Sequence, residues 1–143
     1  MRIVTIGEIL IDLTQTGYNQ QNIPMYAANP GGAPANVAVA ASRLGADTAF
    51  VGMVGSDGFG TYLSQVLEEN NVSTQGLRVG QGATTLAVVS VSAQGERSFQ
   101  FMRGADANLT ADQVDRDLIA GAGIVHFGSV SLTADPARTA TLH

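Results

Sequence analysis

The chain has 143 residues, 45% of them apolar, which is about the length of one domain and enough to bury a hydrophobic core. It contains no cysteine, which excludes disulfides and thiolate sites. It also contains no lysine, which excludes a complete Walker A loop, a protein-kinase site and a Schiff-base enzyme. Its seven basic residues are scattered arginines and its formal net charge is −5, so nucleic acid is not expected as a partner.

The N-terminal segment MRIVTIGEILIDL predicts one buried strand over residues 3–13, because its apolar run is rich in β-branched residues and suits a parallel sheet covered on both faces. Glu8 and Asp12 interrupt it, so it does not resemble a signal peptide, and no uncharged run in the chain reaches the ~20 residues of a membrane helix. We therefore expect a cytoplasmic protein with no membrane partner. Asp12 would lie near the C-terminal end of the strand, where ligands gather in α/β sheets; the alternative is a solvated strand-end residue.

Residues 14–30 are polar and predict a loop with one edge strand. The stretch NPGGAPANVAVAASRLGA then predicts a helix over about residues 34–44. Pro34 suits the first helical turn, the apolar residues that follow have helical spacing, and Gly45 ends the segment.

The remaining elements follow in a regular order. The sequence predicts a buried strand over 48–55, a helix over 59–70, a β-hairpin over 84–103 with its turn at QG, a helix over 112–120 after an N-cap at Thr110, and a buried strand over 123–130. Strands that alternate with helices indicate an α/β layered sheet, and the hairpin adds an antiparallel excursion.

Several strings that suggest chemistry have simpler explanations. GSDGFG lacks the spacing of a dinucleotide fingerprint and reads as a strand-to-helix turn. His126 lies within an apolar strand and His143 is the last residue, so we expect a satisfied core histidine and no metal pair. Acidic residues near the helix over 112–120 suit its start and its solvent face. They are Asp112, Asp115 and Asp117.

The glycine pair ahead of the first helix remains as a candidate site. Gly31 and Gly32 let a ligand approach the backbone, and the positive end of the helix points toward the same place. Asn36 adds donors and an acceptor, and Asp12 adds a carboxylate that accepts hydrogen bonds. This combination suits the hydroxyl groups of a sugar or polyol better than an anion. The alternative is a purely structural glycine turn.

The segment GGAPANVAVAASRLGADTAFVGMVGSDGFG resembles the first signature of the ribokinase and PfkB carbohydrate kinase family. The likeness extends to GEILIDL, NNVSTQGL, TTLAVVSVSAQGERSFQF, ADANL and HFGSVSL, and GGAPANVAVA is similar to the bacterial fructokinase branch. The resemblance implies that residues 1–143 are the N-terminal part of a ribokinase-like α/β domain. A small β lid would be made by segments of about 14–30 and 84–103.

The resemblance also implies roles for particular residues. Asp12, Gly31, Gly32 and Asn36 match positions that bind sugar hydroxyls, in agreement with the site inferred from the residues themselves. Phe101 and Arg103 match positions that approach the sugar in related kinases; the alternative is hairpin packing and surface charge.

The family's second signature, which supplies the catalytic base and the anion hole, has no match here, and neither does the nucleotide pocket. AGAGIV, at residues 120–125, has Ile124 where the catalytic aspartate would stand and leads into a strand. Phosphoryl transfer needs these parts. The expectation is a fructokinase-like, ATP-dependent sugar kinase, truncated before its C-terminal nucleotide-binding half. This chain would hold no catalytic residue or metal ligand, would not fully bind ATP and Mg²⁺, and would be inactive alone.

Two questions stay open at this point. The chain could instead be a non-catalytic sugar-binding module, or a module that forms a homodimer through the β lid, since an exposed hairpin invites association. Fructose is the first choice of sugar, but 2-keto-3-deoxygluconate, ribose-like and nucleoside-like substrates suit the same framework.

Overall fold

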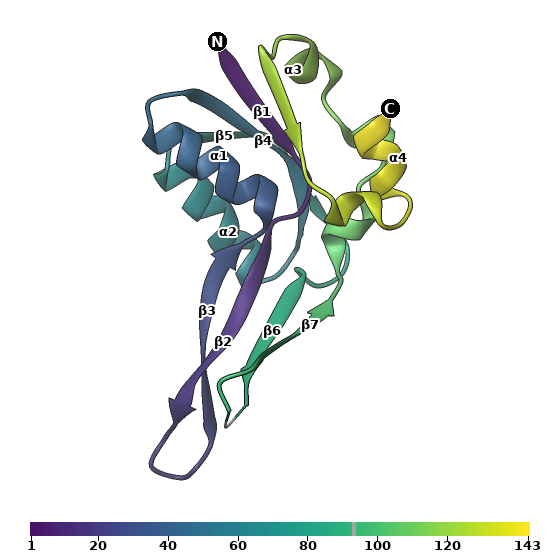
Figure 1. Cartoon of the computed structure of the whole chain (residues 1–143). Coiled ribbons are helices and arrows are strands. Elements are labelled where there is room, and N and C mark those ends of the chain that lie inside the picture. The colour runs from purple at the N-terminus through teal and green to yellow at the C-terminus, as the bar shows by residue number, and fades with distance from the viewer. Residues whose placement is uncertain (93) are drawn as a thin grey trace.

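The computed structural model describes residues 1–92 and 94–143 and contains two β-sheets, one in the upper body of Figure 1 and one in the narrower projection below it. The first, which we call the main sheet, is fully parallel and has the strand order β5-β4-β1-β8. Its strands are β1 (Arg2–Ile6), β4 (Asp47–Gly55), β5 (Val72–Gly80) and β8 (Ile124–Phe127).

Both faces of the main sheet are covered. Helices α1 (Ala33–Arg43) and α2 (Gly58–Glu69) pack on one face, where Phe50 and Val54 of β4 join their core. The intervening Val51 faces the other side and packs with Leu118. This double coverage explains why β4 is apolar almost throughout. The second face carries α3 (Arg116–Ala120), α4 (Ala137–Leu142) and the 3-10 turns η1 (Ala105–Asn108), η2 (Ala111–Gln113) and η3 (Val130–Leu132).

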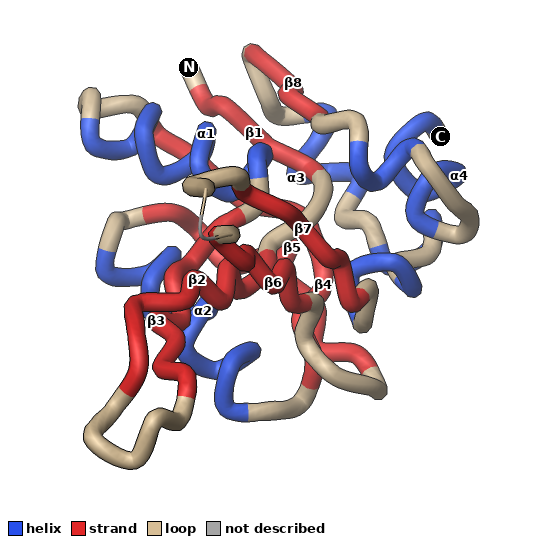
Figure 2. The backbone as a smooth tube through the Cα atoms, turned by 60° about the horizontal axis from the view of Figure 1, so that its bottom comes forward, coloured by secondary structure: helices blue, strands red, loops and turns tan. Residues whose placement is uncertain are grey.

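The second sheet, which we call the small sheet, has the order β3-β2-β6-β7. Figure 2 looks toward the projection and shows these four strands side by side. Strands β2 and β6 are parallel, and each has an antiparallel outer neighbour. The strands are β2 (Leu10–Tyr18), β3 (Pro24–Gly31), β6 (Leu86–Val91) and β7 (Arg97–Met102).

The small sheet uses both segments expected in the lid, 14–30 and 84–103, but it begins earlier, at Leu10. Its outer strand β3 is the expected edge strand, and β6 and β7 form the expected hairpin. Ala93, which precedes the QG turn of that hairpin, lies outside the described residues.

The single strand expected over residues 3–13 is wrong. Strand β1 ends at Ile6, Gly7 has φ of 148°, and β2 begins at Leu10 in the other sheet. A continuous apolar run fits one long buried strand or two short ones equally well, so the pattern did not locate the crossover. Asp12 is consequently an interior residue of β2 and not the end of a strand in the main sheet.

The end of the described chain differs from expectation in two further ways. The helix expected over 112–120 is two short elements, because Asp115 caps α3 anew by accepting from the Leu118 amide at 3.0 Å. The strand expected to be buried, β8, is an edge strand whose one neighbour among the described residues is β1, and Phe127 on it is 48% exposed. His126 is half-buried on this edge and is not a core histidine.

The predictions for several other elements are closer to the structure. Helices α1 and α2 and strand β4 lie within about one residue of their expected ranges, and GSDGFG is the turn between β4 and α2. AGAGIV leads into β8, as expected. Strand β5 was not predicted. Among the described residues, no helix is both long enough and apolar enough to cross a membrane.

Candidate functional site

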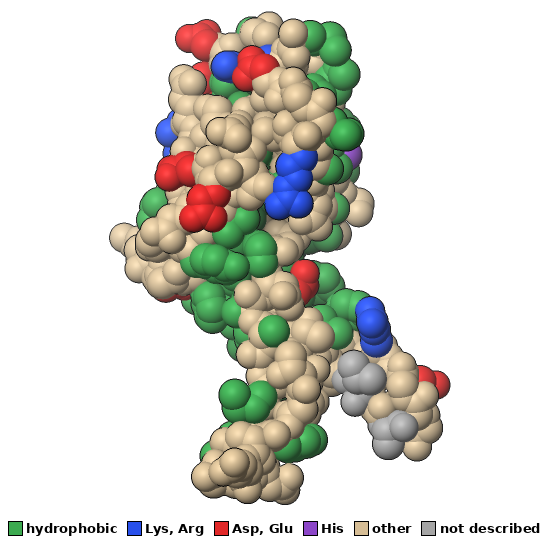
Figure 3. Space-filling view, turned by 90° about the vertical axis from the view of Figure 1, so that its left-hand side faces the viewer, with side chains coloured by type: hydrophobic (Ala, Val, Ile, Leu, Met, Phe, Trp, Pro, Cys, Tyr) green, Lys and Arg blue, Asp and Glu red, His purple; other side chains and the backbone are tan. Residues whose placement is uncertain are grey.

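The candidate site lies where the two sheets meet. The chain passes between them at the β1–β2, β3–α1, β5–β6 and β7–η1 connections. Hydrophobic side chains gather at this junction and on the projection below it (Figure 3). The glycine pair lies on the β3–α1 connection and Asp12 lies early in β2, so the fold brings the predicted residues of both segments to the junction.

Asp12 belongs to a row of residues that crosses the whole small sheet. It is in register with Asn29 on β3 and Ala87 on β6, and Ala87 is in register with Phe101 on β7. Residues in register project from the same face of a sheet. Asp12 and Phe101 therefore share a face, with the small side chain of Ala87 between them, and the Phe101 side chain is 51% exposed on it.

The carboxylate of Asp12 lies directly against Gly31. A Cβ built on Gly31 would overlap Asp12 Oδ2, so only glycine leaves room for this approach. Among the described residues, no donor is hydrogen-bonded to the Asp12 carboxylate, and burial raises its pKa above the ordinary value. A partly dehydrated carboxylate with free acceptor capacity, beside open backbone, is suited to accept hydrogen bonds from a hydroxyl-bearing ligand.

Gly32 is the N-cap residue of α1 and has φ of 104°, a conformation that favours glycine. Its backbone is also crowded, because a Cβ there would lie 2.5 Å from the carbonyl oxygen of Glu8. The side chain of Glu8 reaches the same turn, where Oε1 accepts from the Ala33 amide at 3.1 Å. Gly32 is therefore required by both the turn geometry and the close approach of the β1–β2 connection, whereas Gly31 makes room for the Asp12 carboxylate.

Asn36 lies in the first turn of α1 and is exposed. Asn36 lines a cavity of about 280 Å³ that Gly31 and Pro30 also line and that extends between α1 and α2 toward Asn70. Asp12 does not line this cavity. Gly31 thus contacts Asp12 and also borders the cavity that holds Asn36.

Arg103 follows β7 and is already paired. Its Nη2 lies 2.9 Å from Oδ2 of Asp106, whose side chain is almost fully buried, and its Nη1 lies 3.5 Å from the carbonyl oxygen of Val130. Asp106 also accepts a short hydrogen bond from the Thr85 hydroxyl, and Thr85 Oγ1 accepts from the Gly104 amide at 2.7 Å. Arg103 therefore links the end of the hairpin to the main body and is neither an isolated surface charge nor a free guanidinium.

A second carboxylate at the junction was not predicted. Asp57 caps α2 by accepting from the Gly60 amide at 2.8 Å, and it accepts from both the amide and the hydroxyl of Thr84 at 2.7 Å. Burial raises the pKa of Asp57, but hydrogen bonds from Thr84 and from the Gly60 and Phe59 amides outweigh it and hold the pKa below its ordinary value. An Asp that precedes a helix is a sequence signal for a cap, but its bond to Thr84 is not readable from the sequence.

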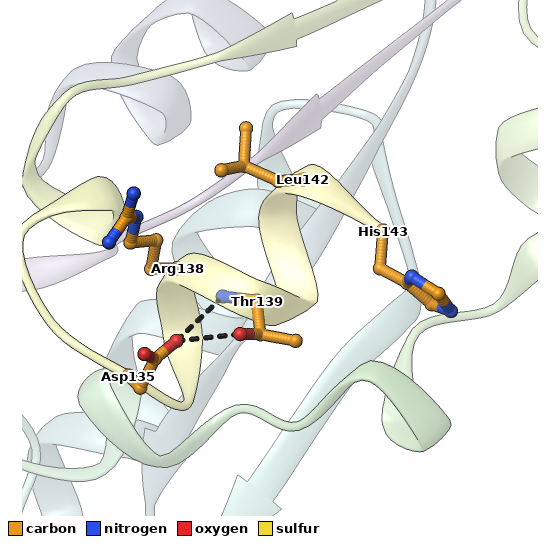
Figure 4. Close-up of a pocket in the computed structure, with 5 residues that line it drawn as sticks. All are labelled: Asp135, Arg138, Thr139, Leu142 and His143. Atoms are coloured by element: carbon orange, nitrogen blue, oxygen red, sulfur yellow. Dashed lines mark hydrogen bonds between the residues drawn. The ribbon is translucent and has the colours of Figure 1, made fainter.

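A cavity of about 270 Å³ beside α4 is separate from this junction. Figure 4 shows that its carboxylate, Asp135, is turned toward the helix, where it accepts from the amide and the hydroxyl of Thr139 at 3.1 and 2.7 Å. These bonds lower the pKa of Asp135. Asp135 thus satisfies a backbone amide in the first turn of α4, whose N-cap residue is Pro136, and none of the predicted site residues lines this cavity.

In residues 1–92 and 94–143, no three His, Asp or Glu side chains are grouped so that they could hold a metal ion. The sequence also has no lysine to contact a phosphate.

Comparison with known proteins shows the family to which this chain is related. The family model for the pfkB family carbohydrate kinases matches residues 1–143. The chain belongs to the pfkB family. It is 48% identical over 145 aligned residues to fructokinase-1 of Zea mays and 46% identical to a fructokinase of Solanum tuberosum, and it spans about 45% of the length of each.

The solved structures show the same relationship. The fructokinase of Xylella fastidiosa is 38% identical, with a TM-score of 0.92 over 98% of this chain and 44% of its own. The fructokinase of Vibrio cholerae O395 bound to fructose, ADP and calcium is 36% identical, with a TM-score of 0.79 over 98% of this chain and 44% of its own. The predicted ribokinase-like α/β fold is confirmed, and the chain covers less than half of each of these two fructokinase structures.

Proposed function

We propose that this chain is the N-terminal, sugar-binding portion of a cytoplasmic, ATP-dependent, fructokinase-like kinase. The observation that carries the proposal is the Asp12 carboxylate, which lies against Gly31 with free acceptor capacity. The fructokinases among its relatives support fructose as the sugar, including the Vibrio cholerae enzyme with fructose bound.

Each predicted residue has a role in this proposal. Asp12 accepts hydrogen bonds from two sugar hydroxyls, the backbone of Gly31 and Gly32 approaches the sugar closely, and the Asn36 amide bonds a further hydroxyl. Phe101 covers the apolar side of the sugar from the face that it shares with Asp12. The small sheet is the lid over the sugar.

Arg103 needs a modified role. Because its guanidinium is paired with Asp106, we propose that it holds the end of β7, and with it Phe101, beside the sugar while its remaining N–H groups face the ligand. Arginine has five N–H donors, so pairing with Asp106 leaves donors for a hydroxyl.

The complete kinase would transfer the γ-phosphoryl group of ATP to a sugar hydroxyl, with ADP as the leaving group and a base that takes the hydroxyl proton. We assign the base, the ATP site and the Mg²⁺ ligands to the C-terminal half. This chain alone would bind sugar without turning it over.

The test is a calorimetric titration of fructose, ribose and 2-keto-3-deoxygluconate into the 143-residue chain and into a form completed with a C-terminal half. We expect fructose to bind both forms and ATP-dependent phosphorylation to occur only in the completed one. Binding that is lost in the short chain would move essential sugar contacts to the missing half. Turnover by the short chain would contradict the assignment of the catalytic base.

A second candidate function is a binding module that forms a homodimer through the lid. All residues of β7 are exposed, and Phe99 and Met102 are more than half exposed on this edge strand. An exposed apolar edge strand is a site for pairing with another chain. Sedimentation equilibrium of the chain and of a Phe99→Ser variant tests this: a dimer that the variant disrupts favours the module, and a monomer at all concentrations excludes it.

A further inference from the structure

Glu8 is a buried carboxylate that neither the sequence analysis nor the proposed function uses. It lies on the β1–β2 connection, where the chain passes from the main sheet to the small sheet, and it is only 2% exposed. Charged residues are rarely buried to this degree without a partner. The contacts of Glu8 therefore indicate what it does.

The side chain of Glu8 caps a helix from a distant part of the chain. Helix α1 begins after Gly32, which has no side chain with which to cap it. Glu8, 25 residues before Ala33, supplies the missing acceptor: Oε1 accepts from the Ala33 amide at 3.1 Å. A carboxylate at this position satisfies a free amide and also interacts favourably with the helix dipole.

The backbone of Glu8 contacts the same turn. Its carbonyl oxygen lies so close to Gly32 that a Cβ there would be 2.5 Å away. Glu8 thus holds Gly32 and Ala33 through its main chain and its side chain together. Four residues later the same segment places the Asp12 carboxylate against Gly31. One short segment therefore contacts three consecutive residues of the glycine turn.

We propose that Glu8 is a positioning residue, which fixes the glycine turn relative to Asp12 and so prepares the sugar site. This rests on the proposed function, since it assumes that Asp12 and the turn bind the sugar. Without the Glu8 acceptor, the Ala33 amide loses its cap and the turn can move away from Asp12. A displacement of this kind weakens binding even though Glu8 does not contact the sugar.

Two substitutions of Glu8 separate the hydrogen bond that Oε1 accepts from the space that the side chain fills. Among the described residues, Oε2 is buried with no hydrogen-bond partner, and it lies 3.6 Å from a Cβ built on Gly128. Glu8→Gln keeps an oxygen acceptor for Ala33, whereas Glu8→Leu has a similar volume and no acceptor. Asp115→Ala is the control, because it removes a comparable cap from α3, away from the glycine turn.

The experiment measures hydrogen exchange of the Ala33 amide by NMR and fructose affinity by calorimetry in the 143-residue chain. In Glu8→Leu we expect exchange at Ala33 to be about tenfold faster and fructose to bind about tenfold more weakly, while Glu8→Gln stays within about threefold of the parent. Asp115→Ala should change neither quantity at the glycine turn. This pattern separates positioning from general stability, which Asp115→Ala also lowers.

The other outcomes decide between the cap and the positioning role of Glu8. Unchanged exchange at Ala33 in Glu8→Leu overturns the cap, and unchanged fructose affinity despite fast exchange overturns the positioning role. If Glu8→Leu does not fold, Glu8→Gln decides: protection of Ala33 and affinity like those of the parent support the role, and loss of either overturns it. If the parent chain does not bind fructose, the short-chain binding in the proposed function fails, and the affinity arm is measured in the completed enzyme.

Discussion

The carboxylate of Asp12 occupies the space that a side chain on Gly31 would need. The two residues belong to neighbouring strands of the small sheet, where Leu10 and Gly31 are in register, so the contact is a diagonal one across the β2–β3 pair. A carboxylate and a bare stretch of backbone are thereby held together at the junction of the sheets. The position of the Asp12 carboxylate depends on the absence of a side chain at Gly31. Single substitutions at Asp12 and at Gly31 therefore test the role of this contact in sugar binding.

Asp12→Asn should stabilise the chain while it weakens sugar binding. Burial raises the pKa of Asp12, so the folded state holds its proton more tightly than the unfolded state does. Stability from this group is consequently present at low pH and is lost as pH rises from about 4 through the raised pKa. The melting temperature of Asp12→Asn should exceed that of the parent at pH 7 and approach it near pH 4.

Sugar affinity should move in the opposite direction in Asp12 variants. In the completed enzyme, Asp12→Ala should weaken fructose binding by about 2–4 kcal/mol, because roughly two charged hydrogen bonds are lost. Calorimetric titration measures this directly. An affinity equal to that of the parent would remove Asp12 from the site.

Gly31→Ala should weaken fructose binding with little loss of fold. The new Cβ would overlap Asp12 Oδ2, so either the carboxylate or the turn must shift, although φ at Gly31 is not in the left-handed region. Gly58→Ala is the matched control, since a Cβ there meets nothing within 4 Å and lies in the first turn of α2. The control should gain about 0.5–1 kcal/mol of stability and keep the parent's affinity. Equal affinities in the two variants would contradict the role of the contact.

The features that the sequence predicted well are local ones. Helix α1 is marked by Pro34, by the spacing of its apolar residues and by Gly45, all within a short window. The crossover after β1 was missed because Gly7 and Glu8 are brief interruptions in an apolar run that suits either sheet. Strand β5 was missed because its buried and exposed positions do not alternate regularly.

The same distinction holds for the site. Asp12, Gly31, Gly32 and Asn36 were predicted because residue chemistry and a family signature agree on them, and their role in sugar binding stays a prediction. The partners that hold the junction together are distant in sequence: Glu8 bonds Ala33 across 25 residues, and Asp57 bonds Thr84 across 27. No local pattern names such a partner, so these carboxylates became visible only in the folded chain.

Asp57→Asn should destabilise the chain at neutral pH and have less effect in acid. The pKa of Asp57 is lowered in the folded state, so its contribution to stability is present above about pH 4 and is lost as pH falls through the folded pKa. Urea unfolding at several values from about pH 3 to about pH 7 measures the difference in the free energy of unfolding between the parent and the variant. This difference should become smaller as pH falls. A difference that stays constant would contradict a contribution of the Asp57 charge to stability.

A double-mutant cycle of Asp57→Asn with Thr84→Val separates the bond between Asp57 and the β5–β6 connection from the cap that Asp57 gives to α2. Thr84 donates to Asp57 and also accepts from the Gly55 amide at 3.1 Å. If the Asp57–Thr84 bond matters, the two substitutions together should cost less than the sum of each alone, with a coupling of about 1 kcal/mol. Additive losses would mean that Asp57 acts only as a helix cap.

Arg103→Gln should loosen the end of the hairpin more than the rest of the small sheet. The substitution leaves the buried Asp106 carboxylate with the Thr85 hydroxyl but without its cation, and we expect a loss of about 1.5–3 kcal/mol because a hydrogen bond between charged groups is removed. Arg103→Gln/Asp106→Asn should recover most of that loss, because no buried charge then remains unpaired. Amide exchange at Phe101 should follow the same order, faster in the single variant and closer to the parent in the double. If the double variant is no more stable than the single one, the ion pair is not what anchors β7, and the hydrogen bond from Gly104 to Thr85 becomes the stronger candidate for holding Phe101 on the face that it shares with Asp12.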